Sequence, residues 1–568
     1  MNTAKVLRTL SAKCRNCYRC VRVCPVKAIG VSDDQAYVNA DRCILCGTCV
    51  RECPQHAKVY RNDIDLASDL LQGEKVIASV APSFSAVYDG WKARNLPSAL
   101  RKLGFFKVTE TAEGAALVAR QTEKMYREAT APTAAICTAC PVVVSYVEKY
   151  RPEHLDKLFP VVSPMIAHAR FLKAYYGPDA KVIFIGPCIA KKREAERAEY
   201  AGDVNAVLTF SELDQWLARE NISLETCAES GFDSIGKVGH AKLFALPGGM
   251  LKTMGIAQDG TQLEVMNTSG MENLKILFES PDILKDLEII EPLVCNEGCI
   301  NGPGIDSGDN LFHRRANLIS YAARRPVLLS ERESRDVDVT LSADFHTGEN
   351  VNEDFNEDRI IKVLSRMDKS DPANELNCGS CGYSSCREKA KAVLRGMAEI
   401  EMCVPYMRKM AEQRMDKIIA SSPSGIVILD HALNILAMND SFCKFFLCGN
   451  NLLGRNISYL LDAHNFEKVA TGTQEFAEEI IFCYGENFHQ IVYRLPDENQ
   501  YVGFFTNVSG TLITEEKIDT LKNETISKAQ ELLDHQTKTA QLMAKFLGES
   551  TARSEELVER LISSYEES

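Results

Sequence analysis

The sequence predicts a multidomain chain in which an α/β core is joined to small cysteine-rich modules and a mixed α+β module. Three observations lead to this prediction. The 568 residues exceed what one hydrophobic core supports. Most of the 21 cysteines fall into groups with short, regular spacings. Apolar runs typical of buried strands alternate with helical patterns between residues 61 and 345, which indicates α/β layers.

The totals of the chain exclude several classes of protein. The net charge of −13 disfavours non-specific nucleic-acid binding, and no apolar run is long enough for a membrane span. Residues 1–12 contain neither an apolar signal-peptide core nor a twin-arginine pair. Cysteines in ligand-like groups fit metal–sulfur ligation in a reducing compartment better than disulfides. We therefore expect a cytoplasmic protein without nucleic-acid or membrane partners.

The first cysteine group lies in residues 1–62 and repeats one spacing, Cys-x2-Cys-x2-Cys-x3-Cys-Pro. This spacing resembles the bacterial two-cluster ferredoxin, in which the cysteine before proline ligates the other cluster. A zinc ribbon is the alternative, and eight cysteines in a double pattern argue against it. The resemblance implies a two-[4Fe–4S] domain that relays electrons. One cube is assigned to Cys14, Cys17, Cys20 and Cys53, and the other to Cys43, Cys46, Cys49 and Cys24.

The next segment, residues 63–345, alternates strand and helix patterns. Apolar runs at 75–83, 181–186 and 205–210 predict buried strands, and residues 113–128 and 167–176 predict helices between them. In such layers, functional groups gather where strands end.

Four cysteines of this segment lie in three short motifs. Cys140 ends Ile-Cys-Thr-Ala-Cys, Cys188 follows Ile-Gly-Pro, and Cys295 and Cys299 belong to Cys-Asn-Glu-Gly-Cys. Four thiolates are what one [4Fe–4S] cube requires, and Pro or Gly beside each suits a tight turn. Buried free cysteines in loops are the alternative.

Together, the ferredoxin-like start and these three motifs resemble an [FeFe] hydrogenase over residues 1–345. The resemblance implies an α/β domain with two lobes that holds an H-cluster, a [4Fe–4S] cube joined to a diiron unit with CO, cyanide and dithiolate ligands. It assigns Cys140, Cys188, Cys295 and Cys299 to the cube, with Cys299 as the bridge to the diiron unit. Lys191 matches the lysine that donates to a cyanide, a role that suits a compact ammonium. The segments lining the diiron pocket correspond to Ala81, Pro82 and Ser83, and to Ser163 and Pro164.

The chain departs from the family at the positions that pass protons. Ala139 replaces the relay cysteine before Cys140, and by spacing Ala116 and Phe159 replace a relay glutamate and a relay serine. Glu113 and Arg120 match outer members of that path. Methyl and phenyl groups do not exchange protons, and a general-acid relay contributes about 10²–10⁴-fold in rate. We therefore expect slow turnover of H2 unless another route replaces the relay.

The nearest titratable candidates for such a route within the motifs are Cys137 and Glu297. The alternative interpretation is a packed cysteine and a solvated or hydrogen-bonded glutamate.

Residues 346–410 begin with an acidic linker and contain a further cysteine group. This group consists of Cys378, Cys381 and Cys386, with Cys403 following after a helical pattern at 387–402. Four thiolates again suit a [4Fe–4S] cube, and the segment resembles a small four-cysteine cluster domain attached to several redox proteins. Zinc is the alternative.

Residues 411–512 resemble a PAS domain in the order of their predicted elements. Strands are predicted at 424–430 and 434–439, helical segments at 440–446 and 453–461, and further strands at 478–484, 489–495 and 501–508. The most typical element is Asn439-x2-Phe442. Cysteine and histidine side chains here suit a bound cofactor or, alternatively, ordinary packing.

Residues 513–568 predict a helix, because apolar residues recur at spacings of three, four or seven from 529 to 547. Such a stripe predicts a homodimer seam or docking on a signalling partner, and packing back onto the PAS-like domain is the alternative. We find no kinase, phosphatase or DNA-binding motif, so any signal must pass through a partner.

The resemblance thus implies a sensory [FeFe] hydrogenase that binds H2, oxidises it slowly and reversibly to protons and electrons, and relays redox state to the PAS domain. Its cofactors would be three [4Fe–4S] clusters outside the H-cluster and the H-cluster itself, and its partners H2, protons and a redox protein. Two alternatives stay open. One is an ordinary catalytic hydrogenase with a different proton path, and the other is an iron–sulfur scaffold without the diiron unit.

Overall fold

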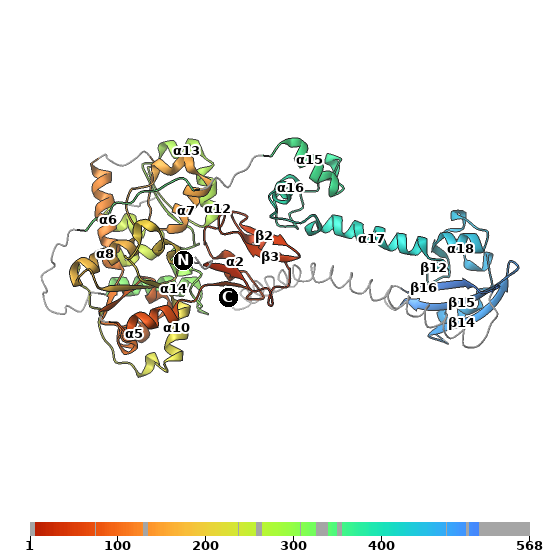
Figure 1. Ribbon diagram of the computed structural model, residues 1–568, viewed down its shortest axis with the longest axis horizontal. Coiled ribbons are helices and arrows are strands. Elements are labelled where there is room, and N and C mark those ends of the chain that lie inside the picture. Colours follow the sequence, from red (N-terminus) through yellow and green to blue (C-terminus); the bar gives the residue numbers. More distant parts are fainter. Residues whose placement is uncertain are drawn as a thin grey trace, which may run out of the picture. The chain divides into compact units, whose positions relative to one another are not determined.

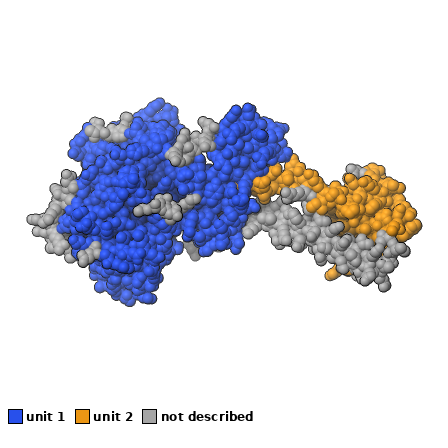
Figure 2. Space-filling view, viewed as in Figure 1, with its two compact units in different colours: residues 1–400 blue, residues 401–568 orange. Residues whose placement is uncertain are grey.

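The computed structural model divides into two compact units, residues 1–400 and 401–568, which are coloured separately in Figure 2. Each unit is described by itself. The residues that the structure describes are 6–73, 75–128, 134–236, 238–256, 264–306, 308–324, 339–348, 355–472, 474–495 and 499–510. None of the helices in these ranges is both long and apolar enough to cross a membrane.

The first module of unit 1 has an internal repeat that follows the cysteine spacing. Each half contains a short helix that carries the third cysteine of its triplet, Cys20 on one and Cys49 on the other. Two antiparallel strand pairs flank these helices, β1 with β4 and β2 with β3. The elements are β1 (Leu7–Thr9), α1 (Arg19–Val23), β2 (Ile29–Ser32), β3 (Gln35–Val38), α2 (Thr48–Arg51) and β4 (Lys58–Tyr60). We call this the dicluster module.

The largest part of unit 1 contains two separate parallel sheets. The first has the strand order β6-β5-β8-β9, and all five residues of its inner strand β5 are buried. A strand buried on both faces reads as a continuous apolar run, which explains the predicted strands at 75–83, 181–186 and 205–210. The strands are β5 (Val76–Val80), β6 (Lys107–Glu110), β8 (Lys181–Gly186) and β9 (Ala206–Thr209).

The second sheet has the order β10-β11-β7, also parallel. Its strands are β7 (Ala135–Ile136), β10 (Val265–Ser269) and β11 (Ile289–Leu293). Helices of this part connect and cover both sheets, and helix α6 packs along α8. They are α3 (Ile64–Leu71), α4 (Phe84–Val87), α5 (Gly90–Leu103), α6 (Ala112–Arg127), α7 (Pro141–Tyr150), α8 (Pro164–Tyr176), α9 (Ala190–Ala195), α10 (Phe210–Arg219), α11 (Gly249–Thr253), α12 (Met271–Phe278), α13 (Pro281–Asp286) and α14 (Leu311–Ala323).

Unit 1 ends in a small helical segment with α15 (Glu357–Arg366) and α16 (Cys386–Leu394). The predicted helix at 387–402 is wrong in its second half. Helix α16 ends at Leu394 because Gly396 takes a positive φ of 68°, and a single short turn follows at Ile400–Met402.

Unit 2 opens with helix α17 (Val404–Ser421) and continues in an antiparallel sheet of order β13-β12-β16-β15-β14 (Figure 1). The predicted helix at 453–461 is wrong. Gly454 takes a φ of 78° and Asn456 caps a 3-10 turn at Ile457–Tyr459, so the chain turns twice before α19 (His464–Ala470). The other elements are β12 (Gly425–Leu429), β13 (Ile435–Met438), α18 (Asp440–Phe445), β14 (Phe476–Cys483), β15 (Glu486–Leu495) and β16 (Gln500–Asn507).

The core of unit 2 is built from aromatic rings, with Phe442, Phe446, Phe488 and Phe505 all nearly inaccessible. Asn439 caps α18 by accepting from the Phe442 backbone N–H, which gives the Asn-x2-Phe pattern its local cause. The predicted C-terminal helix at 513–568 lies outside the described residues.

Candidate functional site

The four motif cysteines all follow carboxyl ends of parallel strands. Cys140 comes four residues after β7 and caps α7, and Cys188 comes two residues after β8. Cys295 comes two residues after β11, and Cys299 lies in the 3-10 turn Gly298–Asn301. The two sheets therefore bring their strand ends to one site, as parallel layers require.

These cysteines lie close enough to interact electrostatically. Burial raises the pKa of Cys188 to about 11, and the nearby Cys140 raises it further. Burial also raises the pKa of Cys295 and of Cys299 far above the usual thiol range, with added contributions from the other motif cysteines. Three neighbouring thiols whose ionisation is disfavoured, with Cys140 close to them, suit a positively charged iron cluster, which would stabilise the thiolates. Their roles as ligands stay predictions.

Glycine contacts hold the second and third motifs together. The Gly304 N–H donates to the Pro187 carbonyl at 2.8 Å. A Cβ at Gly302 would meet the Pro187 Cβ at 2.6 Å, and one at Gly298 would meet the Ala245 carbonyl oxygen at 2.3 Å. Gly298 also takes a φ of 82°. The close backbone approach at these points requires glycine.

The two consecutive lysines after Cys188 have different partners. The Lys191 ammonium forms a buried ion pair with Glu194, at 2.6 Å between Nζ and Oε2. An ammonium has three donors, so this bond leaves Lys191 two more for a ligand in the site.

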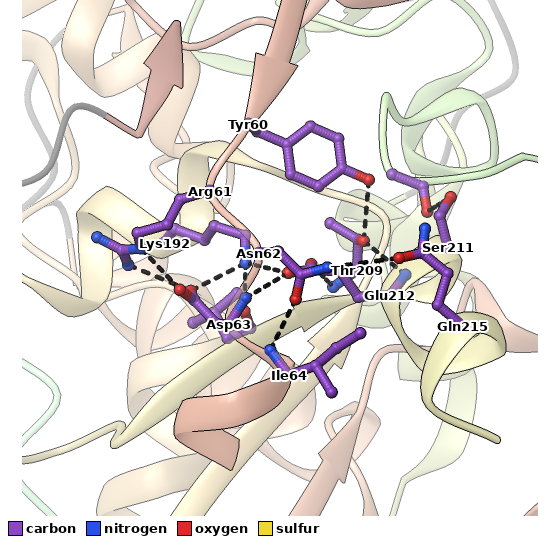
Figure 3. A network of polar contacts seen from close by, with 12 residues as sticks. Tyr60, Arg61, Asn62, Asp63, Ile64, Lys192, Thr209, Ser211, Glu212 and Gln215 are labelled. Carbon is purple, nitrogen blue, oxygen red and sulfur yellow. Dashed lines mark hydrogen bonds and ion pairs between the residues drawn. The ribbon is translucent and has the colours of Figure 1, made fainter. Parts of the chain in front are cut away.

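Lys192, by contrast, is fully buried in the polar network drawn in Figure 3. Its Nζ donates to Asp63 Oδ2 and Glu212 Oε1, each at 2.9 Å, and to the Val207 carbonyl at 2.7 Å. Asp63 belongs to the strand-to-helix connection that leaves the dicluster module. Lys192 therefore ties that connection to α9 and α10.

The segments that the hydrogenase resemblance assigns to the diiron pocket contain two unpartnered hydroxyls. Ser83 and Ser163 are both buried, and neither Oγ has a hydrogen-bond partner among the described residues. Ala81 and Pro82 precede Ser83 after the end of β5, and Ser163 occupies the N-cap position of α8 without a side-chain capping bond. Buried polar atoms normally have partners, so two orphaned hydroxyls in these segments fit a polar group bound next to them.

A cavity of about 440 Å³ reaches the same region from the side of the dicluster module. Its lining includes Thr138, Ser163 and Glu194 from the site and Cys43 from the dicluster module. Because Glu194 also pairs with Lys191, the cavity connects the site to polar groups nearer the surface.

The three positions without a relay group are apolar in the structure. Phe159 and Ala116 are buried, and Ala139 is half-buried beside the same core. Arg120 lies on the surface of α6. Glu113, predicted as an outer relay member, is itself buried.

Glu113 belongs to a closed hydrogen-bond network. Its Oε2 pairs with His168 Nε2 at 3.2 Å, and its Oε1 accepts from the backbone N–H groups of Ile235 and Gly236. His168 Nδ1 lies 2.8 Å from Ser79 Oγ on β5. The sequence pattern did not reveal this histidine, because it lies in the apolar face of a helix.

The titratable group that sequence reasoning missed is Glu291 on β11. Burial raises its pKa to about 7, while the N–H groups of Met250 and Leu251, which donate to it at 3.1 Å each, act in the opposite direction. The negative charge of Glu291 also raises the pKa of Cys299. The sequence signal that could have revealed Glu291 is the presence of an acid within the apolar run before Cys295. A carboxyl that titrates near neutrality beside a metal-type site is a functional candidate.

The two candidates chosen from the motifs are less suited to proton transfer. Cys137 is buried and burial raises its pKa well above the usual thiol range. Glu297 is half-exposed and forms an ion pair with Arg315 at 2.8 Å. These surroundings agree with the alternative interpretation, a packed Cys137 and a solvated Glu297.

In the dicluster module, the structure brings together the cysteines predicted for each cube. Burial raises the pKa of Cys20 to about 11, and Cys17, Cys14 and Cys53 raise it further. Burial likewise raises the pKa of Cys49, with added contributions from Cys46, Cys24 and Cys43. Cys53 therefore lies near the first triplet and Cys24 near the second, and the assignment of these cysteines to two cubes stays a prediction.

The third group is divided between the two units. Cys378, Cys381 and Cys386 lie in unit 1, and Cys403 caps α17 in unit 2. Throughout the described ranges, no three His, Cys, Asp or Glu side chains converge as a single metal ion would require. That result concerns one-ion sites, whereas the four thiolates of a [4Fe–4S] cube each bind a different iron.

Four family models match successive parts of the chain. They are the 4Fe-4S dicluster domain at residues 7–65, the iron only hydrogenase large subunit, C-terminal domain, at 74–303, a putative Fe-S cluster at 374–405 and a PAS domain at 413–481. The predicted domain boundaries themselves stay predictions.

Curated relatives are hydrogenases and a cluster assembly factor. The NADP-reducing hydrogenase subunit HndD of Solidesulfovibrio fructosivorans is 26% identical over 54% of this chain and 59% of its own length. Iron hydrogenase 1 of Clostridium pasteurianum is 27% identical over 40% and 48%. The cytosolic Fe-S cluster assembly factor NAR1 of Kluyveromyces lactis is 33% identical over 16% and 19%. The chain thus spans about half the length of the hydrogenases that it matches.

Among solved structures, the apo [FeFe]-hydrogenase HydA1 of Chlamydomonas reinhardtii is 17% identical with a TM-score of 0.40, over 51% of this chain and all of that one. The family models thus describe residues 74–303 as similar to the large subunit of iron-only hydrogenases, in a chain that also matches models of a 4Fe–4S dicluster domain, an Fe–S cluster and a PAS domain.

Proposed function

We propose that this chain is a sensory [FeFe] hydrogenase of low activity. It binds H2 at an H-cluster and oxidises it slowly and reversibly to two protons and two electrons. The redox state then passes through [4Fe–4S] clusters to the PAS domain. The observation that carries the proposal is a four-cysteine site with a buried lysine whose three usual relay positions, Ala139, Ala116 and Phe159, hold no protic group.

The chain's own residues would hold the H-cluster, which supplies the redox chemistry of H2 when bound. Cys140, Cys188, Cys295 and Cys299 would ligate its cube, and the ammonium of Lys191 would donate to an anionic ligand. The paired Glu194 fixes the position of that ammonium. The unpartnered hydroxyls of Ser83 and Ser163 would offer further donors.

The apolar relay positions bear on the rate. A buried phenyl ring at Phe159 and a buried methyl group at Ala116 exclude water from the usual path. Loss of a general-acid relay costs about 10²–10⁴-fold in rate. Slow turnover suits a protein that reports H2 rather than consuming it.

The electrons would leave through the dicluster module and the cluster of the third cysteine group. We further propose a redox partner protein, a signalling partner for the C-terminal region, and a homodimer. These partners follow from the absence of an output motif in the sequence and from the apolar stripe predicted at 513–568. We propose the cytoplasm as the location.

Two other functions have specific support. An ordinary hydrogenase with a different proton path is supported by Glu291, whose pKa of about 7 suits proton transfer near neutral pH. An iron–sulfur scaffold without the diiron unit is supported by the similarity to the assembly factor NAR1. Lys191 and the two orphaned hydroxyls favour a diiron site over the scaffold.

The test is an infrared spectrum of the protein loaded with a synthetic diiron cofactor, recorded under H2 and under argon, with turnover assayed on the same sample. CO and cyanide bands that respond to H2, with slow turnover, are expected. Fast turnover would establish the ordinary enzyme, and no bands after loading would establish the scaffold. Cys299→Ser serves as the control that removes the proposed bridging ligand.

A further inference from the structure

Within unit 1, the dicluster module lies against the four-cysteine site. Arg51 Nη1 donates to the Asn301 carbonyl at 2.7 Å, two residues after Cys299. A Cβ on Gly47 would meet the Cβ of Pro303 at 2.4 Å. These contacts come from the segment that contains Cys46 and Cys49. The cube assigned to Cys24, Cys43, Cys46 and Cys49, here called the inner cluster, is therefore the neighbour of the site.

The same module also lies against the segment that contains Cys381. The Val31 N–H donates to the Met397 carbonyl at 3.1 Å, and the Tyr37 hydroxyl donates to the Gly396 carbonyl at 3.1 Å. A Cβ on Gly382 would lie 3.1 Å from Val21 Cγ1. Gly382 directly follows Cys381, so the part of the third cysteine group that belongs to unit 1 lies against the dicluster module.

Lys27 lies between the inner cluster and Cys381. Its Nζ donates to the Arg22 carbonyl at 2.9 Å and to the Val21 carbonyl at 3.2 Å. Burial lowers the pKa of Lys27, and Cys24 and Cys381 both act on its ammonium in the opposite direction. Tyr383 is buried, and both of these cysteines raise its pKa.

A second lysine occupies the equivalent place between the two cubes of the dicluster module. Lys58 is buried, and its Nζ donates to Thr9 Oγ1 at 2.5 Å and to the Ala36 carbonyl at 3.3 Å. Its charge acts on Cys20 of the outer cluster, the cube assigned to Cys14, Cys17, Cys20 and Cys53, and on Cys49 of the inner cluster. Lys27 thus lies between the inner cluster and Cys381, and Lys58 lies between the inner and outer clusters.

We propose that the inner cluster is a branch point, from which electrons pass either to the outer cluster or directly to the cluster of Cys381, and that Lys27 is the positioning residue for the second branch. Each step moves one electron, so that one cube is oxidised as its neighbour is reduced. The proposal rests on the proposed function only for the source of the electrons.

The competing arrangement is that electrons reach the cluster of Cys381 from the outer cluster instead of the inner cluster. Arg22 donates to the Cys17 carbonyl at 2.9 Å and to the Ser380 carbonyl at 3.5 Å, so it connects the outer cluster's segment with the third cysteine group. Electrons would then reach Cys381 from the outer cluster. Arg22 is exposed, whereas Lys27 is half-buried and Tyr383 is buried, so solvent and salt screen their electrostatic interactions less.

The test compares Lys27→Gln, Lys58→Gln and Lys285→Gln in the full chain with its iron–sulfur clusters. The last is an exposed lysine of α13 and serves as the control. Potentials are measured by electron paramagnetic resonance during a titration with dithionite. Removing a nearby positive charge disfavours the reduced cluster and lowers its potential.

Lys27→Gln is expected to lower the potentials of the inner cluster and the Cys381 cluster and to leave the outer cluster unchanged. Lys58→Gln is expected to lower those of the inner and outer clusters only. A Lys27→Gln shift at the outer cluster, or none at the Cys381 cluster, would overturn the branch point. Because dithionite replaces H2, this outcome is independent of the infrared test of the H-cluster.

Discussion

Lys192→Met is expected to destabilise unit 1 strongly, because Lys192 is the centre of the buried network in Figure 3. Its side chain is fully buried, and those of Asp63 and Glu212 are 5% and 2% exposed. Methionine fills a similar volume but leaves both carboxylates without their shared cation. It also leaves the Val207 carbonyl without this donor.

The magnitude follows from what remains after the substitution. Breaking a buried ion pair by removing one partner costs about 3–5 kcal/mol. Asp63 keeps Arg61, whose Nε donates to it at 2.7 Å, and Glu212 keeps the backbone N–H groups of Asp63 and Thr209. These remaining bonds place the expected loss toward about 3 kcal/mol rather than the upper end.

A double variant separates charge from packing. Glu212→Gln added to Lys192→Met removes the stranded charge while keeping a side chain that suits the third position of the α10 capping box. The two losses should therefore not add, and we expect a coupling energy of about 1 kcal/mol or more. Lys102→Met, at an exposed lysine of α5, is the control and should change stability by less than about 0.5 kcal/mol.

The assay is urea unfolding followed by the fluorescence of Trp216. This side chain is 2% exposed on α10, one turn beyond Glu212, and the chain has two tryptophans. A Trp91→Phe background isolates its signal. A loss of about 3 kcal/mol lowers the midpoint by about 1 M at a slope near 3 kcal/mol/M. A midpoint for Lys192→Met equal to that of the control would refute the reasoning.

Three further perturbations test other parts of the chain. The folded state raises the pKa of Glu291 from 4.5 to about 7, so its contribution to stability is present below about pH 4.5 and lost as the pH rises through 7. Between pH 5 and pH 8, the free energy of unfolding of the wild type should therefore fall by about 2–3 kcal/mol more than that of Glu291→Gln, measured by unfolding. Gly47→Ala should separate the dicluster module from its neighbour, because the new methyl group meets Pro303. Gly90 also takes a positive φ but has nothing within 4 Å of an added Cβ, so Gly90→Ala is the control. Limited proteolysis checks this, and equal cleavage in both variants would contradict it. Phe446→Ala should cost unit 2 about 3–5 kcal/mol and leave the unfolding midpoint of unit 1, followed by Trp216 fluorescence, unchanged. A shift of that midpoint would contradict separate unfolding of the two units.

Much of the fold could be predicted because its signals are local. The buried strands at 75–83 and 181–186 are short apolar runs, and their parallel pairing puts both faces against helices. The errors came where one residue's backbone conformation decided the outcome. Gly396 and Gly454 both take a positive φ, and each interrupts a segment whose apolar pattern alone favours a helix.

The candidate site could be predicted only in part. The motif cysteines were found because their spacing is a chemical signature, but Glu291 was not, since a buried acid in an apolar strand has no spacing to mark it. The partner of Lys191 was also missed, although Glu194 lies one helical turn away. His168 lies 55 residues from Glu113 in the sequence, and no periodicity connects them.

The sequence by itself determined which cysteines form groups, the order of the modules and the loss of protic groups at Ala139, Ala116 and Phe159. These are properties of residue identity and short spacing, which folding does not change. Only the tertiary structure decided what lies beside each group. Lys27 between Cys24 and Cys381, and Lys192 between Asp63 and Glu212, join residues that are far apart in the chain. Burial and charge at such places depend on packing between segments, and that packing determines pKa values, cluster potentials and the direction that an electron takes.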